Sequence, residues 1–195
     1  FRKTRKQPEK RLALQAYRAY LQRHAQGVHV IPAREAVQKL MYGAAGRKLS
    51  QAKESFVKGK YRLSEKLLRD VVSQRPDLQE AHYLLGMTLA SPVINRIDEA
   101  EQAWRRAGKM PEALVQRGIL AYEEDDLEQA SDLLREAVQL DASSPTAYYY
   151  LGLVHRGLLQ EEQAKKAFQK VMALAPETPL AERAASKLQV MTGQL

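Results

Sequence analysis

The sequence predicts an all-α protein in which helical hairpins stack side by side as an α-solenoid. Helix-forming residues (Leu, Ala, Glu, Gln, Lys and Arg) dominate the 195 residues, which include only ten glycines and eight prolines. The sequence also matches itself when it is shifted by 34 residues, so that Gly152 falls on Gly118 and Ala164 falls on Ala130. A period near 34 indicates an array of one repeated helix–turn–helix unit.

The N-terminal segment, residues 1–44, is expected to form a basic helical extension that precedes the array. Apolar residues at helical spacing predict one helix over residues 8–26. For residues 33–57 we favour one long helix over two short helices joined near residues 43–46.

The last unit shows how each hairpin is built. Ser144 is a good N-cap and stands before Pro145, a residue favoured at the first position of a helix. These signals predict a first helix over 145–157 that ends at Gly157, and a second helix over 161–174. Other predicted helix starts are Asp77 with Glu80, Asp126 with Gln129, and Thr178 before Pro179.

The final segment, residues 179–195, is expected to cap the array. Apolar residues form one stripe over 179–192, which predicts a helix that covers the last repeat.

These units resemble the tetratricopeptide repeat family. The residues that carry the resemblance in the last unit are Tyr148, Leu151, Gly152, His155, Ala164, Phe168, Val171 and Pro176. Three or four repeats match, and they cover roughly residues 45–178. The resemblance implies a superhelical α-solenoid in which Gly152 and Ala164 let two helices cross closely and Phe168 fills the gap between repeats. Arg117, at a position that is usually apolar, departs from the pattern.

The three consecutive tyrosines cannot share one face of a helix, because each residue turns by about 100°. We expect Tyr148 to lie in the core, Tyr149 to point into a groove and Tyr150 to lie on its rim.

Nothing in the sequence points to catalysis. There is no cysteine, which excludes thiolate metal sites and a cysteine nucleophile, and the four histidines lack metal-ligand spacing. No phosphate-binding loop or hydrolase motif occurs. The acidic run at 123–126 is interpreted as a turn that ends in an N-cap, and His155 as a structural histidine. We therefore expect no enzyme activity, no cofactor, no metal and no small-molecule substrate.

The resemblance implies that the first helix of each repeat lines a groove that binds a peptide or helix of a protein partner. An alternative is that the helix over 8–26 folds back and fills this groove. The groove residues implied by the resemblance are Leu49, Lys53, Phe56, Tyr83, Met87, Glu112, Val115, Ile119, Tyr122, Tyr149, Leu153 and Arg156.

Charged residues are distributed unevenly along the chain. Residues 1–75 hold 19 Lys and Arg against five Asp and Glu, a net charge of +14, whereas residues 76–195 hold 12 against 18, a net charge of −6. An excess of basic residues like the one in the N-terminal part of the chain is typical of segments that contact an anionic membrane surface. The residues expected to make this contact are Arg2, Lys3, Arg5, Lys6, Lys10 and Arg11.

Because the chain opens with Phe1, we expect a fragment of a longer protein, with a transmembrane segment upstream as a hypothesis. The expected location is the cytoplasmic face of a membrane, with a soluble cytoplasmic protein as the alternative. Nucleic acid is a disfavoured partner, because no nucleic-acid-binding module is visible.

We therefore expect a non-catalytic scaffold or adaptor, the cytosolic part of a membrane-anchored protein. By resemblance, it would assemble a bacterial envelope complex for secretion, pilus formation or polysaccharide export. The alternatives are a soluble chaperone that holds an amphipathic segment of a client, and a nucleic-acid-associated adaptor.

Overall fold

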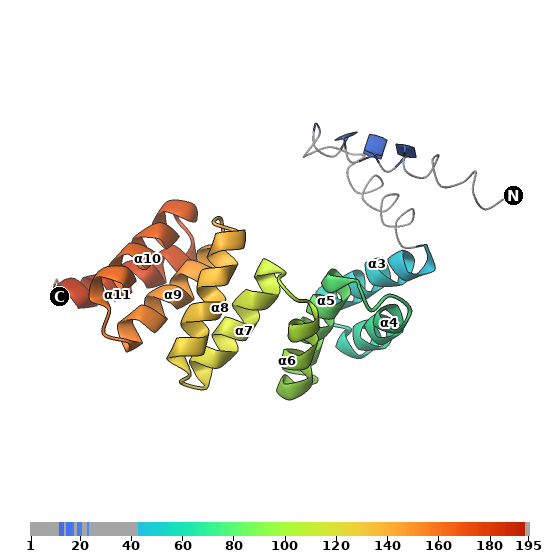
Figure 1. Ribbon diagram of the computed structural model, residues 1–195, viewed down its shortest axis with the longest axis horizontal. Coiled ribbons are helices and arrows are strands. Elements are labelled where there is room, and N and C mark those ends of the chain that lie inside the picture. Colours follow the sequence, from blue (N-terminus) through green and yellow to red (C-terminus); the bar gives the residue numbers. More distant parts are fainter. Residues whose placement is uncertain (1–11, 14, 18, 21–22, 24–42, 194–195) are drawn as a thin grey trace, which may run out of the picture. The chain divides into compact units, whose positions relative to one another are not determined.

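The computed structural model describes residues 12–13, 15–17, 19–20, 23 and 43–193. All regular structure in this part of the chain is helical, which confirms the predicted all-α fold (Figure 1). The chain divides into two compact units, residues 1–100 and 101–195, and each is described by itself.

The first unit contains a helical hairpin, formed by α3 and α4, and a third helix, α5, that packs on it. α3 packs against α4, and α5 packs against both of them. Leu49, Leu68 and Val71 are fully buried in its core. The helices are α3 (Ala44–Val57), α4 (Tyr61–Gln74), α5 (Gln79–Leu89) and α6 (Ile97–Arg106), of which α6 crosses into the second unit.

Polar contacts also join the helices of this unit. The buried hydroxyls of Ser64 on α4 and Thr88 on α5 lie 3.2 Å apart. On the surface, Arg69 of α4 donates to Glu99 of α6 at 2.6 Å. Arg96, just before α6, pairs with Glu65 of α4. Because most of these charged groups are accessible to water, they orient the helices more than they stabilise them.

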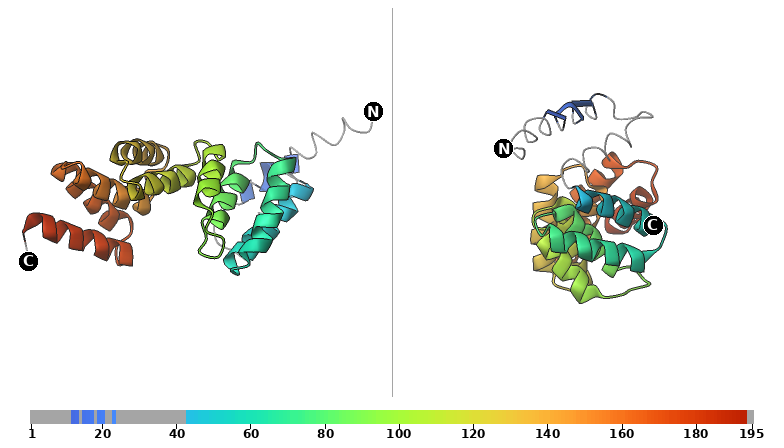
Figure 2. Two further views of the ribbon diagram at one scale, coloured as in Figure 1. Left: turned by 90° about the horizontal axis from the view of Figure 1, so that it is seen from below. Right: turned by 90° about the vertical axis from the view of Figure 1, so that its right-hand side faces the viewer.

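The second unit repeats the hairpin and adds a final helix. Successive helices from α7 to α11 pack against each other, and α9 also contacts α7 and α11 (Figure 2). α11 lies where the sequence predicts a C-terminal helix. The helices are α7 (Pro111–Glu123), α8 (Leu127–Leu140), α9 (Pro145–Gly157), α10 (Glu161–Leu174) and α11 (Pro179–Thr192).

Each hairpin of the second unit brings its two helices together at a glycine. A Cβ atom on Gly152 would lie 2.5 Å from Cε1 of Phe168, and one on Gly118 would lie 2.7 Å from Cγ of Leu134. Phe168 and Leu134 are fully buried. The close crossing expected at Gly152 is therefore present, and it exists because a large side chain on the second helix occupies the space that a Cβ atom would take.

Three of the predicted helix starts are confirmed by their hydrogen bonds. The backbone amide of Gln129 donates to Oδ1 of Asp126 at 3.0 Å, and the amides of Ala147 and Ala181 donate to Ser144 and Thr178 at 3.3 Å. The prediction at Asp77 is wrong. α5 begins at Gln79 after Leu78 without a side-chain cap, because Asp77 instead accepts two hydrogen bonds from Arg75.

The predicted single helix over 33–57 is also wrong. α3 begins at Ala44, and the residue before it, Gly43, has a φ of 58° that a continuing α-helix does not allow.

The turn inside each hairpin contains one residue in the left-handed region. These residues are Gly59, Asn95, Asp125 and Leu159, with φ between 50° and 70°. α9 ends at Gly157, as predicted, but the left-handed residue of the turn that follows is Leu159.

Candidate functional site

Four residues of the predicted groove lie in the core. Leu49, Val115, Tyr149 and Leu153 are exposed by 0%, 5%, 6% and 9%. The expectation that they face a partner is therefore wrong for the folded chain. Tyr149 shows the physical reason, because its ring packs edge-on against Phe168 of α10, with the centroids 5.9 Å apart.

The three consecutive tyrosines take places that differ from the predicted ones. Tyr149 is buried, whereas Tyr148 and Tyr150 are only half-buried. The prediction of a core Tyr148 and an outward Tyr149 is thus reversed. Tyr150 makes edge-to-face contacts with both Tyr149 and Tyr122.

Tyr122 of α7 and Tyr150 of α9 form the centre of an aromatic surface. Their ring centroids lie 5.9 Å apart with an interplanar angle of 75°, a favourable edge-to-face geometry. Ile119 lies one turn before Tyr122 on the same face of α7. All three side chains pack against the core of the second unit and remain partly exposed.

Charged residues flank this aromatic pair. Burial raises the pKa of the Tyr150 hydroxyl above its ordinary value, and the carboxylate of Glu123 raises it further, whereas Arg183 of α11 lowers it. Glu123 and Arg183 therefore act on the Tyr150 hydroxyl through their charges. We call Ile119, Tyr122, Glu123, Tyr150 and Arg183 the tyrosine surface. Sequence reasoning placed Tyr150 on the rim of the groove, interpreted Glu123 only as part of an acidic turn, and did not single out Arg183.

Of the groove residues predicted in the first unit, Lys53 and Phe56 contact side chains of neighbouring helices. Lys53 pairs with Glu80 across α3 and α5. Phe56 packs edge-on against Tyr61, with the centroids 5.5 Å apart. Tyr83 and Met87 are half-buried on α5.

The remaining predicted residues are exposed or undescribed. Glu112 and Arg156 are exposed on α7 and α9. The basic residues Arg2, Lys3, Arg5, Lys6, Lys10 and Arg11 lie outside the described residues, as does most of the helix predicted over 8–26.

The described residues contain neither a candidate metal site nor a candidate membrane-spanning helix. Within the described ranges, no group of three or more His, Cys, Asp or Glu side chains is placed to hold a metal ion. No helix in that part of the chain combines the length and the apolar character that crossing a bilayer requires.

His155 has the structural role that was predicted for it. It is 7% exposed, and its Nδ1 lies 2.7 Å from Oε1 of Gln160. Burial lowers its pKa below the ordinary value of 6.5, the contact with Gln160 raises it, and nearby Arg135 lowers it.

The lowered pKa of His155 predicts a loss of stability at acid pH. Below pH 6.5 the unfolded chain binds a proton that the folded chain still excludes, so the unfolding free energy should fall as the pH drops below that value. One group gives a slope of at most about 1.4 kcal/mol per pH unit. Denaturant unfolding between pH 7.5 and 5 should show this slope, and His155→Gln should flatten it. An unchanged slope in the variant would assign the effect to other groups.

Comparisons with known proteins agree with the hairpin architecture. A family model described as "TPR repeat" matches residues 118–158, and one described as "Tetratricopeptide repeat" matches residues 145–178. No curated protein sequence matches the chain significantly.

Solved structures with the same fold include three of different origin. MamA from Desulfovibrio magneticus RS-1 is 20% identical, with a TM-score of 0.58 over 76% of this chain and 93% of that one. YrrB, described as "a TPR protein with an unusual peptide-binding site", is 16% identical, with a TM-score of 0.58 over 89% and 99%. The Cut9–Hcn1 tetramer of APC/C is 16% identical, with a TM-score of 0.64 over 90% and 39%. At these identities, the likeness shows the fold alone.

Proposed function

Because residues 118–178 match models of the tetratricopeptide repeat, we propose that this chain is a non-catalytic scaffold that binds a peptide segment of a partner protein at the tyrosine surface. The observation that carries the proposal is the Tyr122–Tyr150 pair. These rings lie on the first helices of two successive repeats and stay partly exposed, although the core beneath them is already filled.

The composition of the tyrosine surface supports this role. Tyrosine is enriched at protein interfaces, because it offers a large apolar area together with a polar hydroxyl. The carboxylate of Glu123 and the guanidinium of Arg183, whose charges act on the Tyr150 hydroxyl, would supply an acceptor and a donor for peptide groups. Of the related folds, YrrB is described as having a peptide-binding site, which is consistent with the same class of ligand.

The test is partner capture with a matched control. Tyr122→Ala combined with Tyr150→Ala should weaken partner binding at least about 30-fold, since buried tyrosines are frequent hot spots. Tyr61→Ala removes a half-buried tyrosine of the first unit and should leave binding intact. Circular dichroism checks that all variants are helical. A photo-crosslinking residue at position 122 should attach to one peptide of the partner.

The proposal fails if the captured protein binds the double alanine variant as tightly as it binds the unmodified chain. It also fails if a photo-crosslinking residue at position 122 and one at the exposed position 159 attach to the same peptide of the partner. A Tyr122→Phe and Tyr150→Phe pair separates ring packing from hydrogen bonding, because it removes only the two hydroxyls.

The finer proposal concerns location. The excess of 14 positive charges in residues 1–75 supports a scaffold held at the cytoplasmic face of a membrane, where it would recruit one subunit of an envelope complex. Binding to vesicles that contain anionic lipid, and none to neutral vesicles, would support this. Equal binding to anionic and to neutral vesicles would favour the soluble chaperone.

A further inference from the structure

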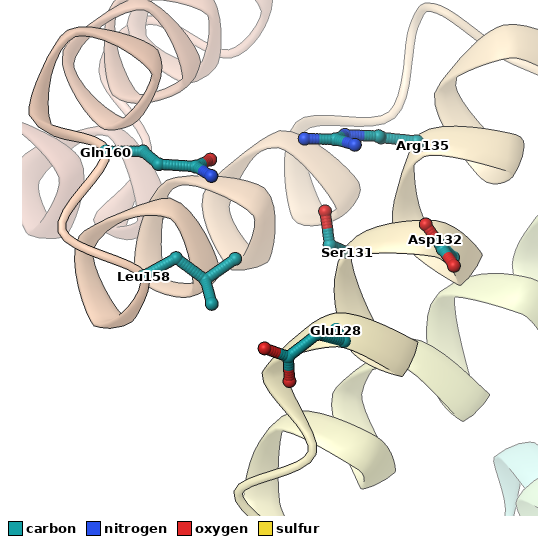
Figure 3. Close-up of a pocket in the computed structure, with 6 residues that line it drawn as sticks. All are labelled: Glu128, Ser131, Asp132, Arg135, Leu158 and Gln160. Carbon is teal, nitrogen blue, oxygen red and sulfur yellow. The ribbon is translucent and has the colours of Figure 1, made fainter.

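A polar pocket of the second unit involves none of the residues of the tyrosine surface. Its volume is about 310 Å³, which is at the small end of ligand pockets. It lies between α8 and the turn that joins α9 to α10 (Figure 3). The residues that line it are Glu128, Ser131, Asp132, Arg135, Leu158 and Gln160.

The floor of this pocket carries an unsatisfied hydroxyl. Ser131 is 4% exposed, and its Oγ has no hydrogen-bond partner among the described residues. Figure 3 shows this oxygen pointing from α8 toward the pocket. A buried hydroxyl without a partner is costly, so a ligand group that bonds it gains affinity.

Gln160 is held in place by a neighbour outside the pocket. Its Oε1 lies 2.7 Å from Nδ1 of the buried His155. The amide nitrogen is therefore left to face the pocket, as Figure 3 shows. This arrangement adds a fixed donor beside the guanidinium of Arg135.

The two ends of the pocket carry opposite charge. Glu128 and Arg135 are seven residues apart on α8, which is about 10.5 Å along a helix axis. Figure 3 draws both side chains reaching from α8 toward the turn that carries Leu158 and Gln160. Glu128, Asp132 and Arg135 form no ion pair with another described residue. Glu128 thus lies at one end of the pocket and Arg135 at the other, with Asp132 between them along α8.

We propose that this pocket binds an arginine side chain of a partner protein. Its guanidinium would pair with Glu128 and Asp132 and donate to Ser131, while its aliphatic stem packs on Leu158. The backbone carbonyl beside that arginine would accept hydrogen bonds from Arg135 and Gln160. The planar guanidinium suits a carboxylate because it donates two parallel hydrogen bonds. The net charge of −6 over residues 76–195 attracts such a basic peptide.

The experiment titrates the ¹⁵N-labelled full chain with the peptide acetyl-Gly-Arg-Gly-amide. The backbone amides of Ser131, Leu158 and Gln160 should shift, together with the side-chain amide of Gln160. The matched probe replaces arginine with citrulline, which has nearly the same shape and no charge. It should bind at least about tenfold more weakly, because the charged hydrogen bonds are lost.

Two variants remove one negative charge each. Glu128→Gln should weaken arginine-peptide binding about tenfold, whereas Glu182→Gln, an exposed glutamate of α11, should leave it unchanged. The proposal is overturned if the citrulline peptide binds equally well, or if Glu128→Gln has no effect. It is also overturned if acetyl-Gly-Glu-Gly-amide binds more tightly, which would make this an anion site. Shifts confined to Tyr122 and Tyr150 would assign the peptide to the tyrosine surface instead.

Discussion

Replacing Phe168 with alanine should lower the unfolding free energy by about 3–5 kcal/mol. The ring is fully buried, and it packs against Tyr149 of α9 within a cluster that includes Ala184 of α11. Its removal leaves a cavity among three helices, at the place where the ring now fills the space beside Gly152.

Denaturant unfolding of the two proteins measures this loss. Phe56→Ala is the matched control, because Phe56 is only half-buried, and it should cost clearly less. A loss below about 1 kcal/mol for Phe168→Ala would mean that the ring does not occupy a closed core.

A second large loss of unfolding free energy is expected for Gly152→Ala. An alanine there places a methyl group 2.5 Å from Cε1 of Phe168, which is too close for any real contact. Overpacking of this kind costs about 1–3 kcal/mol, and the better helix propensity of alanine returns only about 1 kcal/mol. The unfolding free energy should therefore fall in the unmodified chain. In the Phe168→Ala background it should rise, because the methyl group then enters a cavity.

A double-mutant cycle over the four proteins isolates this coupling, which should be at least about 1 kcal/mol. Equal effects of Gly152→Ala in the two backgrounds would show that the methyl group and the ring do not compete for the same space.

Helix boundaries were predictable wherever the start signal is local. Ser144, Asp126 and Thr178 each bond an amide three residues later, so the signal and its effect lie within one turn. Asp77 has the same type of side chain but lies two residues from Arg75, and the guanidinium competes successfully for its carboxylate.

The face on which a side chain lies was less predictable. α9 carries an almost unbroken apolar sequence, and seven of its 13 residues are buried. Helical spacing alone cannot separate Tyr149 from Tyr150 in such a helix. Their places depend on Phe168 of α10 and on Tyr122 of α7, which belong to other parts of the chain.

The polar pocket between α8 and the turn that joins α9 to α10 had no recognisable signal in the sequence. Its residues are ordinary surface types spread from Glu128 to Gln160, and only the packing of one hairpin on the next brings them together. The burial of Ser131, which distinguishes the pocket from a solvated surface, cannot be read from its sequence neighbours.

The left-handed turn residues have a consequence for how this chain can change. Asn95, Asp125 and Leu159 hold a backbone conformation that costs most side chains about 1–2 kcal/mol, although asparagine and aspartate tolerate it better. Leu159 is 87% exposed, so its side chain gives little burial in return. Glycine at position 159 should therefore raise the unfolding free energy, because it adopts this conformation without strain. The added stability would let the chain accept destabilising substitutions while it acquires new partners.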